Sequence, residues 1–402
     1  MITRRTALSG LAAAGFADAI DRAGAANTPA VTKSEIKIGN TVPYSGPASS
    51  FGASLGRGYA AYFRMINDNG GIAGHKVVFV SLDDGYSPPR TVEDTRRLVE
   101  QEKVDFLFGS QGTPTNTAIR EYCNNHKIPQ LFVATNASKW NDPQHYPWTI
   151  GWGPSYRTEA QIYAKHMLQK KPDAKLGLLY QNDDFGKDFA AGVRDVLGDR
   201  SDRIVVKTAT YEATDATVSS QVITLKQSGA DALLIVALPK FAAQAIRQVH
   251  DLNWKPMFFV AQGYSLGAVM EAAGPENAVG LLSAWCLKDP TDPIWDGDPG
   301  MKEFKAFMAK YLPDANIKDG AYIGAYSLTR TLQYVLEKCN GDFSRANVMK
   351  QATNIKNLVI PTLLPGITVN TSPTDYRSVN AMQLVQWDGK SWRRFGEIIV
   401  GA

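Results

Sequence analysis

Short apolar runs alternate with helix-like patterns along almost the whole chain of 402 residues. The apolar runs lie at residues 36–39, 76–80, 104–108, 130–133, 176–180, 204–206, 232–236 and 257–260. The amphipathic patterns lie at residues 52–69, 90–102, 114–125, 156–170, 187–197, 218–228 and 240–251. Continuous apolar strands separated by amphipathic helices are typical of βαβ units around a parallel sheet. Because the pattern restarts after residue 152, we predict an α/β chain with two doubly wound lobes.

The N-terminus has the features of an export signal. Arg4 and Arg5 precede a short apolar stretch at residues 8–16, and small residues follow at 23–26. These features predict a signal peptide over residues 1–26, and the paired arginines favour the twin-arginine route. No cysteine lies near the cleavage region, and no later run of about eighteen apolar residues occurs. We therefore expect a mature protein that is soluble, periplasmic and not a lipoprotein.

Charge and cysteine usage argue against several classes of function. The formal net charge is +4 without a cluster of lysine or arginine, so we expect no nucleic-acid partner and no insertion into a membrane. The three cysteines, Cys123, Cys286 and Cys339, are an odd number, and we interpret them as buried, unreactive thiols. The five histidines form no i, i+4 pair and C-x-x-C spacing is absent, so we expect no metal and no cofactor.

Two kinds of motif suggest catalysis, and each has a structural alternative. Residues 56–61 match G-x-G-x-x-A inside a helical pattern, where glycines serve helix packing, whereas a dinucleotide fingerprint sits at the turn after a strand. The acidic pairs at 83–84 and 183–184 follow strands and could act as acid and base, or form turns and cap helices. A P-loop motif is absent. We favour the structural alternatives and predict that the chain is not an enzyme.

The loops that follow strands are where a doubly wound sheet binds its ligand. Residues 109–118, GSQGTPTNTA, form a glycine-flanked, hydroxyl-rich turn before a helix, which presents backbone N–H groups to an anion. Thr113 is the expected N-cap of that helix. Aromatic residues in or beside the post-strand loops predict an apolar cleft for a small ligand: Phe51, Trp140, Trp148, Trp152, Phe185 and Tyr264.

Four stretches resemble the branched-chain amino-acid type of solute-binding proteins, which serve ABC importers and have the type I periplasmic-binding fold. They are residues 42–52, 69–74, 83–84 and 180–186. The resemblance implies two lobes joined by three crossover strands, near residues 150–154, 283–288 and 364–368. The N-terminal lobe is then expected to comprise residues 34–152 and 286–365, and the C-terminal lobe residues 153–285 and 366–402, which end in a strand, turn and strand.

The resemblance also implies a set of ligand-binding residues. The family holds an amino acid's carboxylate mainly from the N-terminal lobe, at positions that correspond here to Gly112, Thr113, Ala134, Thr135, Asn136 and Ala137. Gln111 is also expected among the ligand-binding residues. The other expected site residues are Phe51 and Phe185 at the aromatic lid positions, with Leu238, Gln262 and Tyr264. Amino-acid binders typically place an acidic residue at the position of Gln262 and often a tyrosine at that of Leu238. The family disulfide is missing, with Tyr86 and Gly112 at its positions.

These departures favour a ligand without an ammonium group, because a buried ammonium without a carboxylate partner costs roughly several kcal/mol. We therefore expect a monomeric binding protein that closes its lobes on a small organic carboxylate and delivers it to an ABC permease in the inner membrane. The ligand body is expected to be aromatic or aliphatic, as in a benzoate-like or phenylpropanoid acid. The alternatives are hydrophobic amino acids or amides as ligands, an exported sensor, and an α/β hydrolase or other enzyme.

Overall fold

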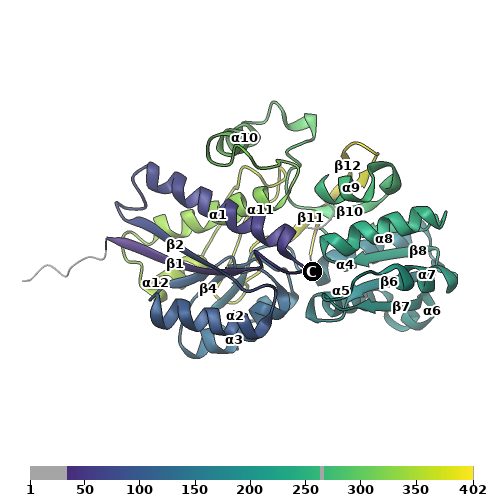
Figure 1. The fold of residues 1–402 in the computed structure, drawn as a ribbon, viewed down its shortest axis with the longest axis horizontal. Coiled ribbons are helices and arrows are strands. Elements are labelled where there is room, and N and C mark those ends of the chain that lie inside the picture. Colours follow the sequence, from purple (N-terminus) through teal and green to yellow (C-terminus); the bar gives the residue numbers. More distant parts are fainter. Residues whose placement is uncertain (1–33, 263–266, 402) are drawn as a thin grey trace, which may run out of the picture. The chain divides into compact units, whose positions relative to one another are not determined.

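The computed structural model describes residues 34–262 and 267–401. The predicted signal peptide at residues 1–26 and the site residue Tyr264 lie outside the described residues. The named strands form two sheets, and helices cover both, so the predicted α/β class with two doubly wound lobes is confirmed (Figure 1).

The first sheet is entirely parallel and has the strand order β2-β1-β3-β4-β5. Its strands are β1 Glu35–Val42, β2 Lys76–Asp83, β3 Phe106–Phe108, β4 Gln130–Val133 and β5 Thr149–Gly151. In the register of the sheet, Ile38 of β1 lies beside Phe79 of β2 and Phe106 of β3. β3, β4 and β5 are buried along their whole length, as expected for parallel strands covered on both faces.

Helices pack on both faces of this sheet because successive strand side chains point to opposite sides. Phe106 and Phe108 face a core shared with α1 and α11, whereas Leu107 faces a smaller cluster under α3. The helices on this lobe are α1 Ser49–Asp68, α2 Pro88–Arg96, η1 Arg97–Gln101, α3 Thr113–Asn125, η2 Ser138–Trp140, η5 Pro293–Trp295, α10 Pro299–Tyr311, α11 Ala321–Lys338 and α12 Arg345–Ala352. We call the larger cluster, which runs from β1 to α12, the first core.

The second sheet has the order β12-β11-β10-β9-β8-β6-β7. Its strands are β6 Leu176–Gln181, β7 Val205–Tyr211, β8 Ala232–Val236, β9 Met257–Val260, β10 Leu282–Trp285, β11 Ala381–Trp387 and β12 Trp392–Val400. The strands from β7 to β10 are parallel, and β11 and β12 add an antiparallel hairpin at one edge, as the C-terminal pattern predicts.

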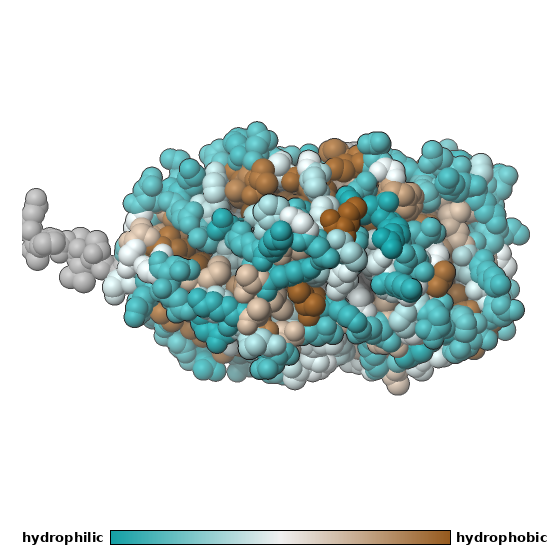
Figure 2. All heavy atoms as spheres, turned by 90° about the horizontal axis from the view of Figure 1, so that it is seen from above, coloured by the Kyte–Doolittle hydropathy of each residue, from teal (hydrophilic) through white to brown (hydrophobic). Residues whose placement is uncertain are grey.

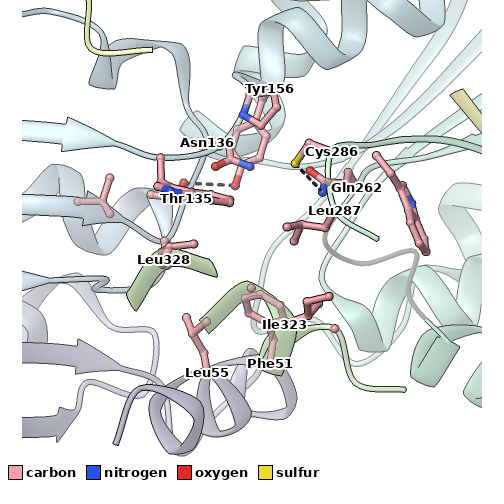
Figure 3. A pocket seen from close by; sticks show the side chains of 18 of the residues that line it. Phe51, Leu55, Thr135, Asn136, Tyr156, Gln262, Cys286, Leu287, Ile323 and Leu328 are labelled. Carbon is pink, nitrogen blue, oxygen red and sulfur yellow. Dashed lines mark hydrogen bonds between the residues drawn. The ribbon is translucent and has the colours of Figure 1, made fainter. Parts of the chain in front are cut away.

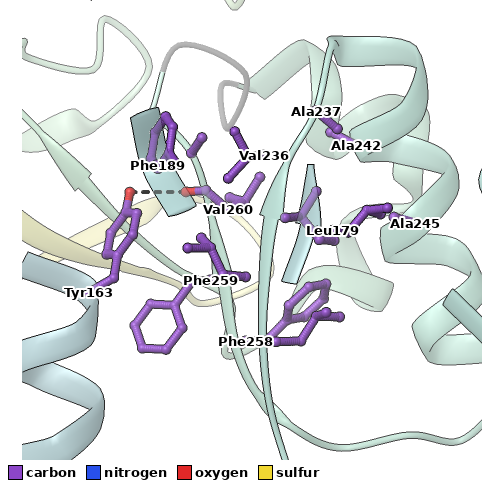
Figure 4. Close-up of a cluster of buried hydrophobic side chains, with 14 of the residues drawn as sticks. Tyr163, Leu179, Phe189, Val236, Ala237, Ala242, Ala245, Phe258, Phe259 and Val260 are labelled. Atoms are coloured by element: carbon purple, nitrogen blue, oxygen red, sulfur yellow. Dashed lines mark hydrogen bonds between the residues drawn. The ribbon is translucent and has the colours of Figure 1, made fainter. Parts of the chain in front are cut away.

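The second sheet also carries helices on both faces. They are α4 Tyr156–Lys170, α5 Asp184–Leu197, η3 Gly198–Arg200, α6 Ser201–Ile204, α7 Ser219–Gln227, α8 Pro239–Asp251, α9 Gly267–Ala273 and η4 Pro275–Ala278. Figure 4 shows the centre of this lobe, where Tyr163 of α4 lies beside Phe259 and Val260 of β9. We call this cluster the second core.

The chain passes between the two lobes three times. Trp152 packs in the first core and Tyr156 in the second; Trp285 packs in the second core and Cys286 in the first. Val379 is the last member of the first core before β11 enters the second. The lobe boundaries remain a prediction, and these contacts favour a last crossing near residue 380 over one at residues 364–368.

The described surface is mainly hydrophilic, and its exposed apolar side chains are dispersed (Figure 2). The large apolar side chains with the highest exposure are scattered over separate elements: Tyr44, Ile223, Val279, Ile294, Val359 and Val400. Figure 2 shows a face on which hydrophilic residues predominate and apolar residues form small, separate groups. Within residues 34–262 and 267–401, none of the helices has the length and apolar character needed to span a bilayer.

The predicted burial of the three thiols and the predicted role of glycine in helix packing are confirmed, and the unreactive character of the thiols stays a prediction. Cys123, Cys286 and Cys339 are all free and buried. A methyl group on Gly58 of α1 would lie 2.6 Å from the Cβ of Ala325 in α11, which is closer than two carbon atoms approach. Gly58 of the G-x-G-x-x-A match therefore serves the close packing of α1 on α11, whereas Gly56 lies against Tyr44.

Gly58→Ala and Gly324→Ala form a matched pair of substitutions in these two helices. Gly58→Ala overpacks the interface and is expected to lower the free energy of unfolding by about 1–3 kcal/mol. A methyl group on Gly324 meets nothing within 4 Å, so Gly324→Ala is expected to raise it by about 0.5–1 kcal/mol through helix propensity. Urea denaturation of both variants checks this, and a Gly58→Ala protein as stable as Gly324→Ala would contradict it.

Candidate functional site

A cavity lies between the two cores, at the ends of strands from both sheets (Figure 3). Its volume of about 110 Å³ holds several water molecules. The wall comes from α1 and α11, the loops after β4 and β5, the start of α4, and the ends of β9 and β10. The lining residues are Phe51, Leu55, Val133, Ala134, Thr135, Asn136, Trp152, Gly153, Pro154, Tyr156, Gln262, Trp285, Cys286, Leu287, Lys288, Gly320, Ile323, Gly324 and Leu328.

Most of this lining is apolar or aromatic. Phe51, Trp152 and Trp285 contribute large rings. Ile323 and Leu328 of α11 contribute branched aliphatic side chains (Figure 3). The lining residues that the structure describes include no aspartate or glutamate. Such a surface suits the apolar body of a small ligand and offers no negative charge to an ammonium group.

The charged side chain in the described lining, Lys288, already has partners. Its Nζ atom lies 2.8 Å from both carboxylate oxygens of Asp298 and donates to the carbonyl oxygen of Pro361 at 2.7 Å. The ammonium also lies 5.1 Å from the centre of the Trp295 ring. Lys288 therefore contributes a neutralised pair to the wall rather than a free positive charge.

Neutral hydrogen-bonding groups gather at the ends of β4 and β9. The hydroxyl of Thr135 lies 2.5 Å from that of Thr113. It also lies 3.3 Å from the hydroxyl of Tyr156 (Figure 3). On the opposite wall, Nε2 of Gln262 lies 3.7 Å from the sulfur of Cys286. A ligand that enters the cavity meets hydroxyl groups on one side and an amide on the other.

The expected N-cap role of Thr113 is wrong. Gly112 occupies the cap position of α3 with a φ of 104°, where glycine is favoured, and Thr113 is the first residue of the helix. The Thr113 side chain points to Thr135 instead. The hydroxyl of the first residue of α3, Thr113, therefore joins the hydrogen-bonded hydroxyls of Thr135 and Tyr156 at the end of β4.

The structure brings some of the expected site residues together and separates others. Phe51, Ala134, Thr135, Asn136 and Gln262 line the cavity. The remaining expected residues that the structure describes do not line the cavity. Gln111, Gly112 and Thr113 are buried behind Thr135 or beside it. Ala137 borders a neighbouring cavity, and Phe185 and Leu238 pack in the second core.

The acidic pairs after strands serve the local structure. Asp183 caps α5, accepting from the backbone N–H groups of Phe185 at 2.9 Å and Gly186 at 3.3 Å. Asp84 accepts from the N–H of Tyr86 and the hydroxyl of Thr91. Among the residues described, no cluster of three or more histidine, cysteine, aspartate or glutamate side chains is arranged to hold a metal ion.

Comparison with known protein families matches residues 35–391 to a model described as periplasmic binding protein. The chain belongs to this family. A relative named Leu/Ile/Val-binding protein homolog 7, from Brucella abortus (strain 2308), is 26% identical over 376 residues, covering 90% of this chain and 91% of the relative. Homolog 8 from the same strain is 24% identical over 74% of this chain and 76% of its own. The resemblance to the branched-chain amino-acid type is confirmed.

Solved structures share the fold of this periplasmic binding protein. A substrate-binding periplasmic protein from Ralstonia solanacearum has a TM-score of 0.81 at 22% identity, covering 90% of this chain and 100% of that one. A branched-chain amino-acid ABC transporter protein from Thermus thermophilus with bound valine has a TM-score of 0.81 at 17% identity, over 92% and 98%. A fatty acid ABC transporter substrate-binding protein from Thermomonospora curvata has a TM-score of 0.75 at 19% identity, over 93% and 94%.

In this periplasmic binding protein, Tyr86 fills the space above Gly112. A methyl group on Gly112 would lie 2.7 Å from a ring carbon of Tyr86. The Tyr86 hydroxyl accepts from Nε2 of Gln181, at the end of β6, at 3.3 Å, and its ring packs in the second core. The protein's own ring thus occupies the surface over the turn where the resemblance places a carboxylate.

A residue missed by the sequence analysis, Glu159, lies behind the cavity wall. Its side chain is fully buried on α4, and Oε1 accepts from the Tyr163 hydroxyl at 2.6 Å and from the backbone N–H of Gln262 at 2.5 Å. Burial raises the pKa of this carboxyl to about 8. Tyr156, Glu159 and Tyr163 are three and four residues apart and share one helix face, which is the signal that would have revealed it.

Substitutions at Tyr86 are expected to separate packing from the hydrogen bond to Gln181. Tyr86→Phe keeps the ring and should cost about 1 kcal/mol of unfolding free energy. Tyr86→Ala leaves a cavity and should cost about 3–5 kcal/mol. Urea denaturation measures both, with Tyr122→Phe, which removes a surface hydrogen bond to Glu100, as a control of about 0.5 kcal/mol or less. Equal costs for Tyr86→Phe and Tyr86→Ala would contradict the packing role.

Glu159 makes stability depend on pH with a defined sign. The carboxyl stays protonated in the native state up to about pH 8 but ionises near pH 4.5 in the unfolded chain. Between these values the unfolded chain binds fewer protons than the native protein, so the free energy of unfolding falls as pH rises. Between pH 5 and pH 8, the free energy of unfolding of the wild-type protein should fall by on the order of a few kcal/mol relative to that of Glu159→Gln. Urea denaturation across this range tests it, and parallel profiles for the two proteins would refute it.

Proposed function

We propose that this protein binds a small hydrophobic organic carboxylate between its lobes and delivers it to the permease of an ABC importer. The observation that carries the proposal is the described lining of the cavity, which combines aromatic and aliphatic walls with neutral donors and contains no carboxylate. Proteins of this family act as substrate binders of ABC transporters. We further propose that the chain is exported to the periplasm and acts as a monomer.

The polar groups of the cavity suit a carboxylate better than an ammonium. Gln262 and Asn136 carry amide N–H donors, and Tyr156 and Thr135 carry hydroxyls, all of which can donate to oxygen. An ammonium needs acceptors and a counter-charge, and without a carboxylate partner its burial costs roughly several kcal/mol. The Lys288–Asp298 pair adds no net charge to either case.

Two structural neighbours support the carboxylate part of this proposal. The neighbour from Thermus thermophilus holds valine, and the one from Thermomonospora curvata is named for fatty acids. An amino acid and a fatty acid share an apolar body with a carboxylate, and they differ in the ammonium group. The position of Gln262 in the lining favours a ligand on the fatty-acid side of this difference.

Binding is proposed to favour a closed arrangement of the lobes, because the ligand contacts both. Phe51 and Thr135 belong to the first lobe, and Gln262 and Trp285 come from the ends of strands in the second. A ligand held by all four gains contacts only when the two walls approach each other, and this differential contact shifts the equilibrium.

A hydrophobic amino acid remains the second candidate ligand because one buried carboxyl, Glu159, lies behind Gln262. If Glu159 were ionised, its charge could partner an ammonium in the cavity. An amino acid would need a negative charge at that wall to pair with its ammonium, whereas a simple carboxylate would be repelled by one. A binding titration with one ligand of each kind therefore separates the two candidates.

Isothermal titration of the wild-type protein against benzoate, 4-hydroxybenzoate and leucine tests the proposal. We expect binding of at least one aromatic acid and no tight binding of leucine. Gln262→Glu places a negative charge in the wall and should weaken acid binding by at least about tenfold, because like charges a few ångströms apart repel by more than 1.4 kcal/mol. Gln244→Glu, outside this cavity, makes the same substitution and serves as the control. Tight leucine binding without acid binding would overturn the proposal.

A further inference from the structure

The carboxyl of Glu159 lies directly behind the part of the wall that carries Gln262 and Cys286. The backbone N–H of Gln262 donates to Oε1 of Glu159, while the Gln262 side chain itself lines the cavity. Cys286, the next lining residue on that wall, is close enough for the Glu159 charge to add to burial in raising the pKa of its thiol to about 12. Glu159 is therefore separated from a bound ligand by one layer of protein.

No positive charge compensates this carboxyl within the described residues. Glu159 is fully buried and forms no ion pair, and its Oε2 atom has no hydrogen-bond partner in the described structure. Arg157, on the same helix, points away and holds Asp195 of α5. Lys288, across the cavity, is held by Asp298.

The titratable groups that face Glu159 are all acids. They are Tyr163 on the same helix, Tyr156 at its start and Cys286 beyond β10. Burial raises the pKa of Tyr156 and of Cys286 to about 12 and that of Tyr163 well above its ordinary value, so none of them changes charge between about pH 6 and pH 9. Within that range, a change of charge at this wall comes from Glu159.

We propose that Glu159 determines the sign of charge that the cavity accepts: held uncharged behind Gln262, it admits an anionic ligand, and when ionised it excludes one. This inference rests on the proposed function, since it names the residue that makes the same cavity selective for carboxylates. Glu159 is a positioning and specificity residue rather than a contact residue, because it bonds to the backbone of Gln262 and lies outside the lining.

The proposal fixes the shape of the pH profile. A carboxylate ligand binds the protonated form of Glu159, so its affinity is constant while Glu159 keeps its proton and falls once that proton is lost. Above about pH 8 the decline approaches about tenfold per pH unit if only the protonated form binds. A ligand that needs an ionised Glu159 as the partner of its ammonium shows the opposite trend and binds more tightly as pH rises.

Isothermal titration with benzoate between about pH 6 and pH 9.5 tests the inference, because the carboxyl of benzoate stays ionised throughout. Wild-type affinity is expected to be constant at low pH and to fall above about pH 8. Glu159→Gln, which cannot ionise, should give a flat profile. Asp84→Asn removes another fully buried carboxyl, one outside the cavity lining, and should keep the wild-type profile.

A second measurement needs no variant at Glu159. Benzamide has the shape of benzoate without its charge, so its affinity for the wild-type protein should not change over the same pH range. A falling benzamide profile would assign the effect to a general loss of structure and overturn the inference, even if Glu159→Gln fails to fold.

The remaining outcomes separate this inference from the proposed function. A flat wild-type benzoate profile, or a fall that persists in Glu159→Gln, overturns the role of Glu159 and leaves carboxylate binding standing. Leucine affinity that rises with pH in the wild-type protein and not in Glu159→Gln makes Glu159 an ammonium partner and overturns the inference. Failure of the wild-type protein to bind any aromatic acid overturns the proposed function, and the inference with it.

Discussion

Burial of parallel strands on both faces is the constraint on which the rest of this molecule depends. A strand such as β8, which is buried at every residue, cannot expose a side chain along its length. The residues that such strands contribute to a ligand site therefore lie at or beyond the strand ends. Both sheets send strand ends, those of β4, β9 and β10 among them, to one cavity, so a few short loops carry the chemistry of the site.

The fold was predictable because it depends on short-range patterns. Continuous apolar runs and helical periodicity give the strands and helices. Thr135, Asn136 and Gln262, which line the cavity, were expected at the site from the family resemblance, and each lies in a loop that follows a predicted strand. The contributions of α11 and Trp285 were not predictable in this way. They depend on which face of a helix reaches the cavity and on where the chain crosses, and both follow from tertiary packing.

Tyr86 and Glu159 show a second limit of sequence reasoning. In the sequence, Tyr86 stood out only as the residue at a missing disulfide position, and Glu159 did not stand out at all. In the structure each makes a hydrogen bond to a residue distant in sequence: Tyr86 with Gln181, and Glu159 with the backbone of Gln262. The ring of Tyr86 fills the space over Gly112, and the hydroxyl of Thr113 turns to Thr135. The open volume consequently lies beside the crossings and α11, not over the turn that precedes α3.

The crossings at residues 152–154 and 285–288 form part of the cavity lining as well as the connection between the cores. Under the proposed lobe closure, a ligand seated there lies beside the segments that connect the lobes and about which they would turn. For a rotation about an axis, a given displacement produces a larger angle when it is applied closer to that axis. One additional methylene on the ligand would therefore alter the angle between the lobes more than the same group at the outer rim, and a permease that reads this angle would sense ligand size through it.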